Sequence, residues 1–152
     1  MHRDVLTEPA ALLFPSLARF PDFYLAGGTA LALQIGHRVS VDFDLFSDHE
    51  IDRALLSQLR RLFGGTSEIA PLVNNVDELT VLVNGVKITF LRYPFPVREA
   101  FVMYDNVPLL SIGEIAATSL HNRPARIVQG LRGLVFCGYR RPRDASRYHC
   151  GC

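Results

Sequence analysis

The first 120 residues alternate between short apolar segments and polar or glycine-containing breaks. In 51–63, leucine and isoleucine recur at three- and four-residue spacing, which predicts an amphipathic helix. The segments 78–83 and 86–92 are rich in apolar residues and flank Asn84-Gly85, a dipeptide that favours a two-residue hairpin turn. Further helices are predicted from Pro9 to about Arg19, from Thr29 to Ile35 and from Ser111 onward, and further strands over 22–26, 39–46, 66–72 and 107–110.

Several residues indicate where these elements begin and end. Gly36 is expected to end the helix of 29–35, and Pro15 limits or kinks the first helix. Ser111 is expected to be the N-cap of the last helix, with Glu114 three residues on forming a capping box. Together the elements predict a small mixed β-sheet with helices packed on it, in an α/β or α+β fold.

The composition is that of an ordinary globular protein. The chain has 152 residues, of which 49% are hydrophobic and 20% charged, so one domain with a real core is expected. No apolar run reaches the roughly 18 residues that span a bilayer, and the first residues lack the pattern of a signal peptide. We therefore expect a cytoplasmic protein without a membrane partner.

The net charge of +1 hides a sharp division of the chain. Residues 1–120 contain nine basic and fourteen acidic side chains, whereas 121–152 contain seven arginines, one acid and all three cysteines. Such a break in composition predicts two parts. We expect a folded domain over 1–120 and a poorly ordered or loosely packed Arg/Cys-rich segment over 121–152.

The pattern with the most chemical content lies in 23–47, FYLAGGTALALQIGHRVSVDFDLFS. A Gly27-Gly28 turn before a helix offers main-chain N–H groups to an anion. Asp42 and Asp44 are one residue apart on a predicted strand, so their carboxylates point to the same side. A carboxylate pair suits Mg²⁺ that also binds phosphate oxygens. The sequence therefore predicts Asp42 and Asp44 as metal-binding and catalytic residues at a nucleoside triphosphate site.

Three neighbours complete the predicted nucleotide site. Thr29 is expected to cap its helix and donate its hydroxyl to a phosphate oxygen, Arg38 to neutralise phosphate charge, and Ser40 to contribute from between the turn and the carboxylates. Plainer interpretations stay open, because two acids at a strand end are often simply solvated. The glycine turn could bind no ligand, and Arg38 could pair with Asp42 or Asp44. His37 is expected to be structural.

The string LAGGTALALQIGHRVSVDFDLFS, residues 25–47, resembles the AbiEii/AbiGii-type nucleotidyltransferases, which are toxins of type IV toxin–antitoxin systems in the polymerase-β-like superfamily. Weaker similarity continues through 85–96 and 109–117. The resemblance implies a nucleotidyltransferase-like fold and transfer of a nucleotide from an NTP to an acceptor, which in some relatives is a tRNA end. It also implies Mg²⁺ held by Asp42 and Asp44, and a cognate antitoxin as partner.

Two features depart from the family pattern. The superfamily often has a third carboxylate on a later strand, and the corresponding residue here is Thr89, which cannot act as a base at neutral pH. Glu78 is a candidate substitute, although it also fits a solvated strand acid. Lys87, the only lysine, could reach a phosphate or simply be exposed. In addition, 118–141 lacks the expected lysine-bearing helix and the motif near R-x-x-x-K-D-x-x-D-L.

We considered several interpretations of the 121–152 segment. A shifted reading frame over 122–136 can encode T-G-R-x-G-S-Y-K-D-F-V-D-L-Y-F, close to the missing motif, and the coding DNA tests this hypothesis. Alternatively, the arginines could bind RNA phosphates. His149, Cys150 and Cys152 supply at most part of a zinc site, and disulfides are not expected with an odd cysteine count in this compartment.

Three functional hypotheses follow. The first is a nucleotidyltransferase of the AbiEii toxin type that lacks its C-terminal helical part. The second is a catalytically inactive remnant that binds an antitoxin or RNA. The third is a small nucleic-acid-binding protein that works through its basic segment. Nucleotide binding in the presence of Mg²⁺ separates the first from the second, and deletion of the residues after Leu120 tests the third.

Overall fold

The structure is a computed structural model that describes residues 1–65 and 68–121. Met1–His121 form one compact unit. The predictions made for the Arg/Cys-rich segment, including its order, its reading frame and its ligands, lie outside the described residues.

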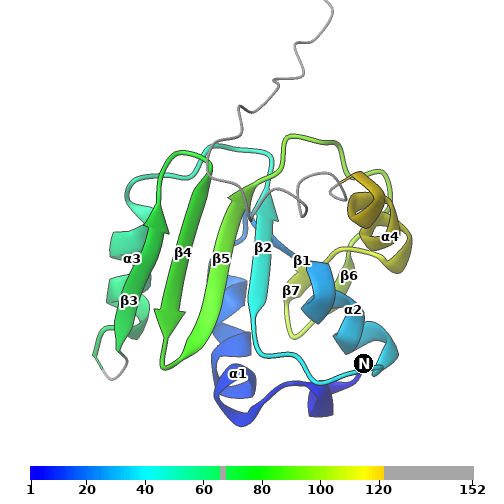
Figure 1. The fold of residues 1–152 in the computed structure, drawn as a ribbon, viewed down its shortest axis with the longest axis horizontal. Coiled ribbons are helices and arrows are strands. Elements are labelled where there is room, and N and C mark those ends of the chain that lie inside the picture. The colour runs from blue at the N-terminus through cyan, green and yellow to red at the C-terminus, as the bar shows by residue number, and fades with distance from the viewer. Residues whose placement is uncertain (66–67, 122–152) are drawn as a thin grey trace, which may run out of the picture. The chain divides into compact units, whose positions relative to one another are not determined.

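The described residues form a seven-stranded sheet with the order β3-β4-β5-β2-β1-β7-β6 (Figure 1). Most neighbouring strands are antiparallel, but β2 pairs with β5 and β1 pairs with β7 in parallel. The predicted mixed sheet is therefore confirmed. The strands are β1 Tyr24–Ala26, β2 Phe43–Ser47, β3 Ile69–Asn74, β4 Glu78–Val83, β5 Val86–Arg92, β6 Val102–Tyr104 and β7 Val107–Leu109.

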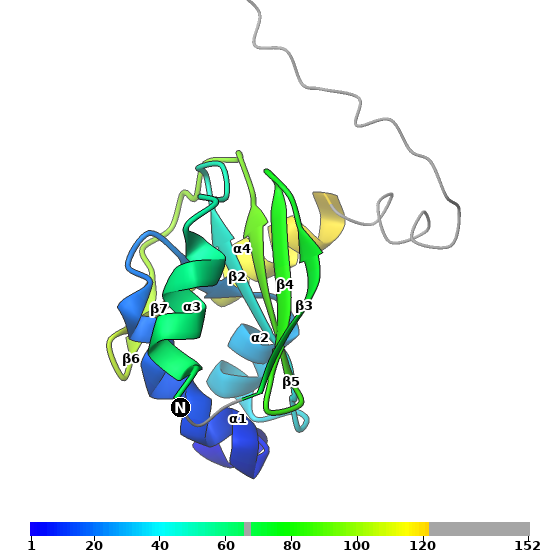
Figure 2. The same cartoon turned by 90° about the vertical axis from the view of Figure 1, so that its left-hand side faces the viewer.

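Helices cover both faces of this sheet. In Figures 1 and 2, α2 and α4 lie on one face, and α1 and α3 lie on the other. On the α1 side, the ring of Phe14 packs 6.0 Å from that of Phe43, and Phe20 packs 5.1 Å from Phe90. The helices are α1 Glu8–Leu13, α2 Gly27–Ile35, α3 Leu55–Phe63 and α4 Ile112–His121, with short 3₁₀ helices η1 Arg3–Val5 and η2 Phe14–Arg19.

Some element boundaries differ from the predictions for identifiable reasons. The first helix divides at Phe14 into α1 and η2, because Pro15 has no N–H to continue the α-helical hydrogen bonds. The helix predicted to start at Ile51 begins only at Leu55. Strand β2 is shorter at its start than predicted, and Ser40 before it forms an isolated parallel bridge with Leu6.

Strand β6 was not predicted. It pairs with β7 across Asp105-Asn106, two residues that both have positive φ, 48° and 63°. Asp and Asn tolerate this backbone conformation better than other side-chain-bearing residues. Asp105-Asn106 between short apolar segments is therefore a turn signal of the same kind as Asn84-Gly85, from which the hairpin of β4 and β5 was predicted.

Helix α4 begins as predicted, with Ser111 Oγ accepting the Glu114 N–H at 3.1 Å. In a capping box the Glu114 carboxylate would accept the N–H of Ser111. Here its Oε1 accepts the N–H groups of Arg98 at 2.7 Å and Glu99 at 3.1 Å. Thus Glu114 fastens the 98–99 loop to the helix start. Among the described residues, no helix is long and apolar enough to cross a membrane.

Candidate active site

The corner between β1 and α2 brings a glycine against an aspartate. Ala26, the last residue of β1, pairs with Asp44 on β2. Gly27 follows with φ of +67°, and a Cβ added to it would lie 2.8 Å from Asp44 Oδ2. Only glycine combines this conformation with so close an approach. The turn predicted from Gly27-Gly28 is thus packed directly on the predicted Asp44 carboxylate.

Thr29 connects the turn to Asp42. Its side chain is buried, and its hydroxyl donates to the main-chain oxygen of Asp42 while lying 2.6 Å from Ser40 Oγ. Because Thr29 has one proton and gives it to Asp42, Ser40 is the donor in the second bond. The Thr29 hydroxyl therefore positions the Asp42 backbone, and its role toward a phosphate stays a prediction.

The prediction that Thr29 caps its helix is wrong. Helix α2 begins two residues earlier, at Gly27, and its N-cap is Ala26, which makes no side-chain cap hydrogen bond. The glycine turn itself forms the first turn of the helix, so Thr29 lies inside it with its side chain directed into the structure. Gly36 ends α2 with φ of +67°, as predicted.

Ser40 is held from a second direction by the N-terminal segment. Its N–H donates to Val5 O at 2.7 Å, beside the bridge between Leu6 and Ser40. Main chain and side chain of Ser40 are therefore both engaged within the protein. Sequence patterns gave no indication that residues 5–6 support the segment that leads into Asp42.

Asp42 and Asp44 lie at the start of β2. Asp44 is inside the strand and Asp42 immediately precedes it, and both are half-buried. The parallel register places Asp44 beside Thr89 and Phe43 beside Ile88 of β5, so the next pair outward is Asp42 with Lys87. The two carboxylates thus share one side of the sheet with Lys87 and Thr89.

Lys87 forms a salt bridge with the first aspartate. Its Nζ lies 3.1 Å from Asp42 Oδ2, and the two side chains are 42% and 41% exposed. Lys87 is the only lysine in the chain. The structure pairs it with Asp42, whereas the plainer prediction was an exposed lysine on a strand. Sequence reasoning named Lys87 but did not pair it with Asp42.

Thr89 and Glu78, the two residues considered for the expected third carboxylate, lie on β5 and β4. Thr89 lies beside Asp44, and its hydroxyl is 3.4 Å from that of Thr80 on β4. Glu78 Oε1 accepts from the Thr80 hydroxyl at 2.6 Å. Because β5 separates β4 from β2, Glu78 lies two strands, or about 10 Å, across the sheet from β2, and the register sets it level with Phe46 rather than with the aspartates. The structure therefore does not bring Glu78 to the pair.

Arg38 lies over the glycine turn. A Cβ on Gly28 would be 2.0 Å from Arg38 Nη2, so the absence of a side chain there leaves room for the guanidinium. His37 is exposed in the same loop. The Arg38 guanidinium therefore lies beside the turn, and its role toward a phosphate stays a prediction.

The donor set suits a metal that is shared with substrate. No group of three or more His, Cys, Asp or Glu side chains converges within the described residues, which leaves two carboxylates at the site. Mg²⁺ commonly binds one or two carboxylates together with substrate phosphates and water. Asp42 and Asp44 fit that requirement, with Asp44 held against Gly27 and Asp42 anchored through Thr29.

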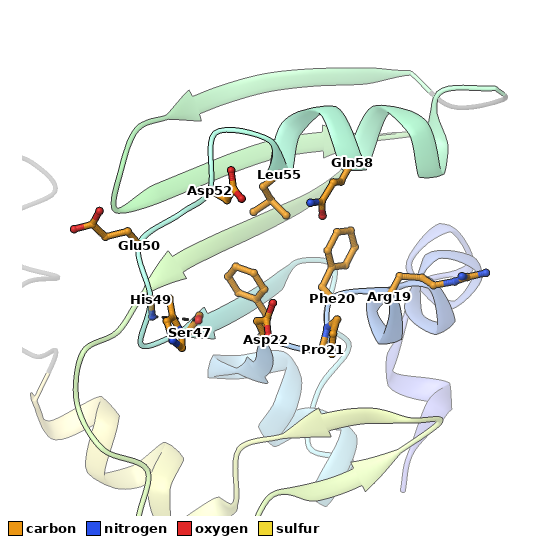
Figure 3. A pocket seen from close by; sticks show the side chains of 11 residues that line it. Arg19, Phe20, Pro21, Asp22, Ser47, His49, Glu50, Asp52, Leu55 and Gln58 are labelled. Carbon is orange, nitrogen blue, oxygen red and sulfur yellow. Dashed lines mark hydrogen bonds between the residues drawn. The ribbon is translucent and has the colours of Figure 1, made fainter.

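A pocket of about 410 Å³ lies elsewhere in the molecule (Figure 3). It is lined by residues 19–23, by the end of β2 with the loop that follows it, and by α3, whereas Asp42 precedes the start of β2. Two of its polar residues are already paired, His49 with Asp48 and Glu50 with Arg92. None of the predicted nucleotide-binding residues lines this pocket.

The sequence matches a family model over the same part of the chain that forms the site. The description of that family is nucleotidyl transferase AbiEii toxin, type IV toxin–antitoxin system, and the match covers residues 12–119. The chain belongs to the AbiEii family. The resemblance inferred from residues 25–47 is thereby confirmed.

Relatives of this AbiEii chain extend beyond it. An uncharacterized protein of Aquifex aeolicus is 40% identical over 84 residues, which are 55% of this chain and 40% of the relative. The chain thus spans less than half the length of that relative.

Solved structures show the same fold. A Helicobacter pylori protein described as a nucleotidyltransferase superposes with a TM-score of 0.54 at 17% identity, covering 75% of this chain and 59% of that one. A Thermotoga maritima protein described in the same way gives 0.54 at 14% identity, covering 82% and 92%. At such low identity the similarity concerns the fold, which is nucleotidyltransferase-like.

Proposed function

We propose that this AbiEii chain transfers a nucleotide from an NTP to an acceptor hydroxyl, with Asp42 and Asp44 as the Mg²⁺-binding catalytic residues. The observation that carries the proposal is the contact between the glycine turn and the aspartates. Gly27 adjoins Asp44, and Thr29 holds the backbone of Asp42. The proposed phosphate-binding turn therefore lies directly against the proposed metal-binding aspartates.

The start of α2 suits a triphosphate. The first N–H groups of a helix have no acceptor within it, and Ala26, the N-cap residue of α2, has no side-chain acceptor for them. These groups, together with the helix dipole, favour an anion at Gly27-Gly28. Arg38 lies over Gly28 and would add a charged donor to the same phosphates.

Each residue has a defined task in the proposed reaction. Asp42 and Asp44 hold Mg²⁺, which when bound neutralises charge that develops on the phosphates. The turn and Arg38 orient the triphosphate so that the acceptor hydroxyl oxygen attacks the α-phosphorus. The bond between the α- and β-phosphates breaks, pyrophosphate leaves, and the hydroxyl proton passes to solvent. Ser40 and Thr29 keep the Asp42 backbone in place. Little covalent work falls to the protein, as in phosphoryl transfer generally.

The deciding experiment measures label transfer from α-labelled NTPs to total tRNA. Asp42→Asn should lower transfer by about a hundredfold or more, because it removes charge from a metal ligand. Asp48→Asn is the matched control, since Asp48 is an exposed acid beyond the other end of β2, paired with His49. Transfer by Asp42→Asn at the wild-type rate would remove Asp42 from the mechanism.

The biological setting of the proposal is that of a type IV toxin. We infer a cytoplasmic enzyme whose acceptor is a tRNA end and whose partner is a cognate antitoxin. Family membership supports a nucleotide substrate and an antitoxin partner. Replacing total tRNA by other RNA in the transfer assay tests the acceptor, and co-purification with an antitoxin encoded beside the gene tests the partner.

One observation favours a second candidate function. Thr89 occupies the place beside Asp44 where the superfamily often has a third carboxylate, which supports an inactive remnant that binds an antitoxin or RNA. Calorimetry with NTP and Mg²⁺ distinguishes the two. Binding with label transfer supports the enzyme, whereas antitoxin or RNA binding with no uptake of NTP supports the remnant.

A further inference from the structure

The salt bridge between Lys87 and Asp42 joins a cation to a proposed metal ligand. Lys87 Nζ lies 3.1 Å from Asp42 Oδ2. The residues on either side of Lys87, Val86 and Ile88, are buried, and β5 is bonded to β4 on one side and β2 on the other. The backbone of Lys87 is therefore fixed in the sheet, and only its flexible side chain can leave Asp42.

The charges at the site explain why a cation is present. Asp42 and Asp44 bring two negative charges to one side of the sheet, and the register sets Lys87 and Thr89 beside them. Thr89 is neutral, so Lys87 is the charged group that β5 contributes here. A divalent cation bound to Asp42 Oδ2 would be repelled by the Lys87 ammonium, which lies 3.1 Å from the same oxygen.

We propose that Lys87 is the resident counter-ion of the Asp42/Asp44 pair and competes with the divalent cation for Asp42. The inference rests on the proposed function, in which these aspartates hold the metal. Before metal binds, Lys87 balances part of the carboxylate charge. When metal and nucleotide bind, Lys87 moves from Asp42 to the phosphates, which its exposed side chain and flexible stem allow.

A purely structural role for Lys87 makes the opposite prediction. If the salt bridge only held Asp42 in its binding geometry, removing Lys87 would loosen Asp42 and weaken metal binding. If Lys87 competes with the metal, removing it strengthens metal binding in the absence of nucleotide. The direction of the change therefore separates the two roles.

The test is titration of the full chain with Mn²⁺ alone, followed by electron paramagnetic resonance of the free ion. Lys87→Gln and Lys87→Met should each lower the Mn²⁺ Kd by about two- to fivefold, the range expected for one exposed ion pair. Lys87→Arg keeps the charge and should leave Kd near the wild-type value. Arg61→Gln, which removes an exposed charge from α3 on the other face, controls for net charge.

Asp42→Asn separates failure of the inference from failure of the proposed function. If Asp42→Asn weakens Mn²⁺ binding while Lys87→Gln and Lys87→Met leave it unchanged or weaker, the counter-ion role is overturned and the metal site stands. If Arg61→Gln tightens binding as much as Lys87→Gln, the effect is one of net charge and the inference is also overturned. If Asp42→Asn and Asp44→Asn both bind Mn²⁺ like the wild type, the metal site itself is wrong, and the inference falls with it.

Discussion

Gly27 and Asp44 are in such close contact that no side chain fits between them. A Cβ on Gly27 would lie 2.8 Å from Asp44 Oδ2, and the φ of Gly27 is +67°. The register of β1 and β2 creates this contact, since Ala26 pairs with Asp44 and Gly27 turns at once into α2. The position of the carboxylate is thus coupled to the conformation of the turn.

Gly27→Ala should impair catalysis more than stability. Alanine at positive φ costs about 1–2 kcal/mol, and its methyl group would push the Asp44 carboxylate out of position. We expect a lower free energy of unfolding in urea together with loss of most label transfer. Gly85→Ala is the matched control, because Gly85 has φ of +80° but nothing within 4 Å of the added Cβ. Gly85→Ala should lower the free energy of unfolding through backbone strain but keep label transfer. Equal losses of label transfer in both variants would contradict the expected effect of the Gly27 contact with Asp44.

Thr29→Val should destabilise the segment that leads into Asp42. Valine has nearly the shape of threonine but leaves the Asp42 carbonyl and the Ser40 hydroxyl without their shared partner, at a cost of about 1–3 kcal/mol. Thr29→Ser keeps the hydroxyl and should retain most of the stability and metal affinity. Urea denaturation and Mn²⁺ titration of both variants measure the effect. A valine variant as stable as wild type would show that this hydroxyl pair contributes nothing.

Ionisation of the Tyr24 phenol is expected to lower the stability of the protein in alkaline solution. Burial raises the pKa of the Tyr24 phenol, and Tyr93, Asp48 and Glu114 nearby add to the increase. The unfolded chain releases this proton near its ordinary pKa of about 10, whereas the folded protein keeps it. The stabilisation of the folded state that follows from the raised pKa of Tyr24 is therefore fully present below pH 10. It is lost as the pH rises further.

The matched comparison for that effect is Tyr24→Phe, which keeps the ring contacts with Phe46 and Phe101 but has no ionisable group. Between pH 9 and 11, the free energy of unfolding should fall more steeply for the wild type than for the variant. Parallel pH profiles would show that Tyr24 ionises alike in the folded and unfolded states.

Much of the local structure could be predicted because it depends on neighbours in the chain. Asn84-Gly85 forms the expected hairpin turn with φ values of 51° and 80°, Gly36 ends α2, and Ser111 caps α4. The errors were also local in origin. Thr29 looks like a cap in the sequence, but the preceding glycines already enter the helix, and the turn at Asp105-Asn106 lies between strands of only three residues each.

The sequence alone determined the family, the mixed sheet and the candidate aspartates, because glycine turns, strand alternation and a string such as GGT…DFD are properties of consecutive residues. Only the tertiary structure decided which groups meet these aspartates. Parallel pairing of β2 with β5 sets Lys87 at Asp42 and Thr89 beside Asp44, and the fold of the 36–42 loop brings Ser40 to Thr29. Such contacts join residues far apart in the chain, and their register is set by how the whole sheet packs rather than by any local pattern.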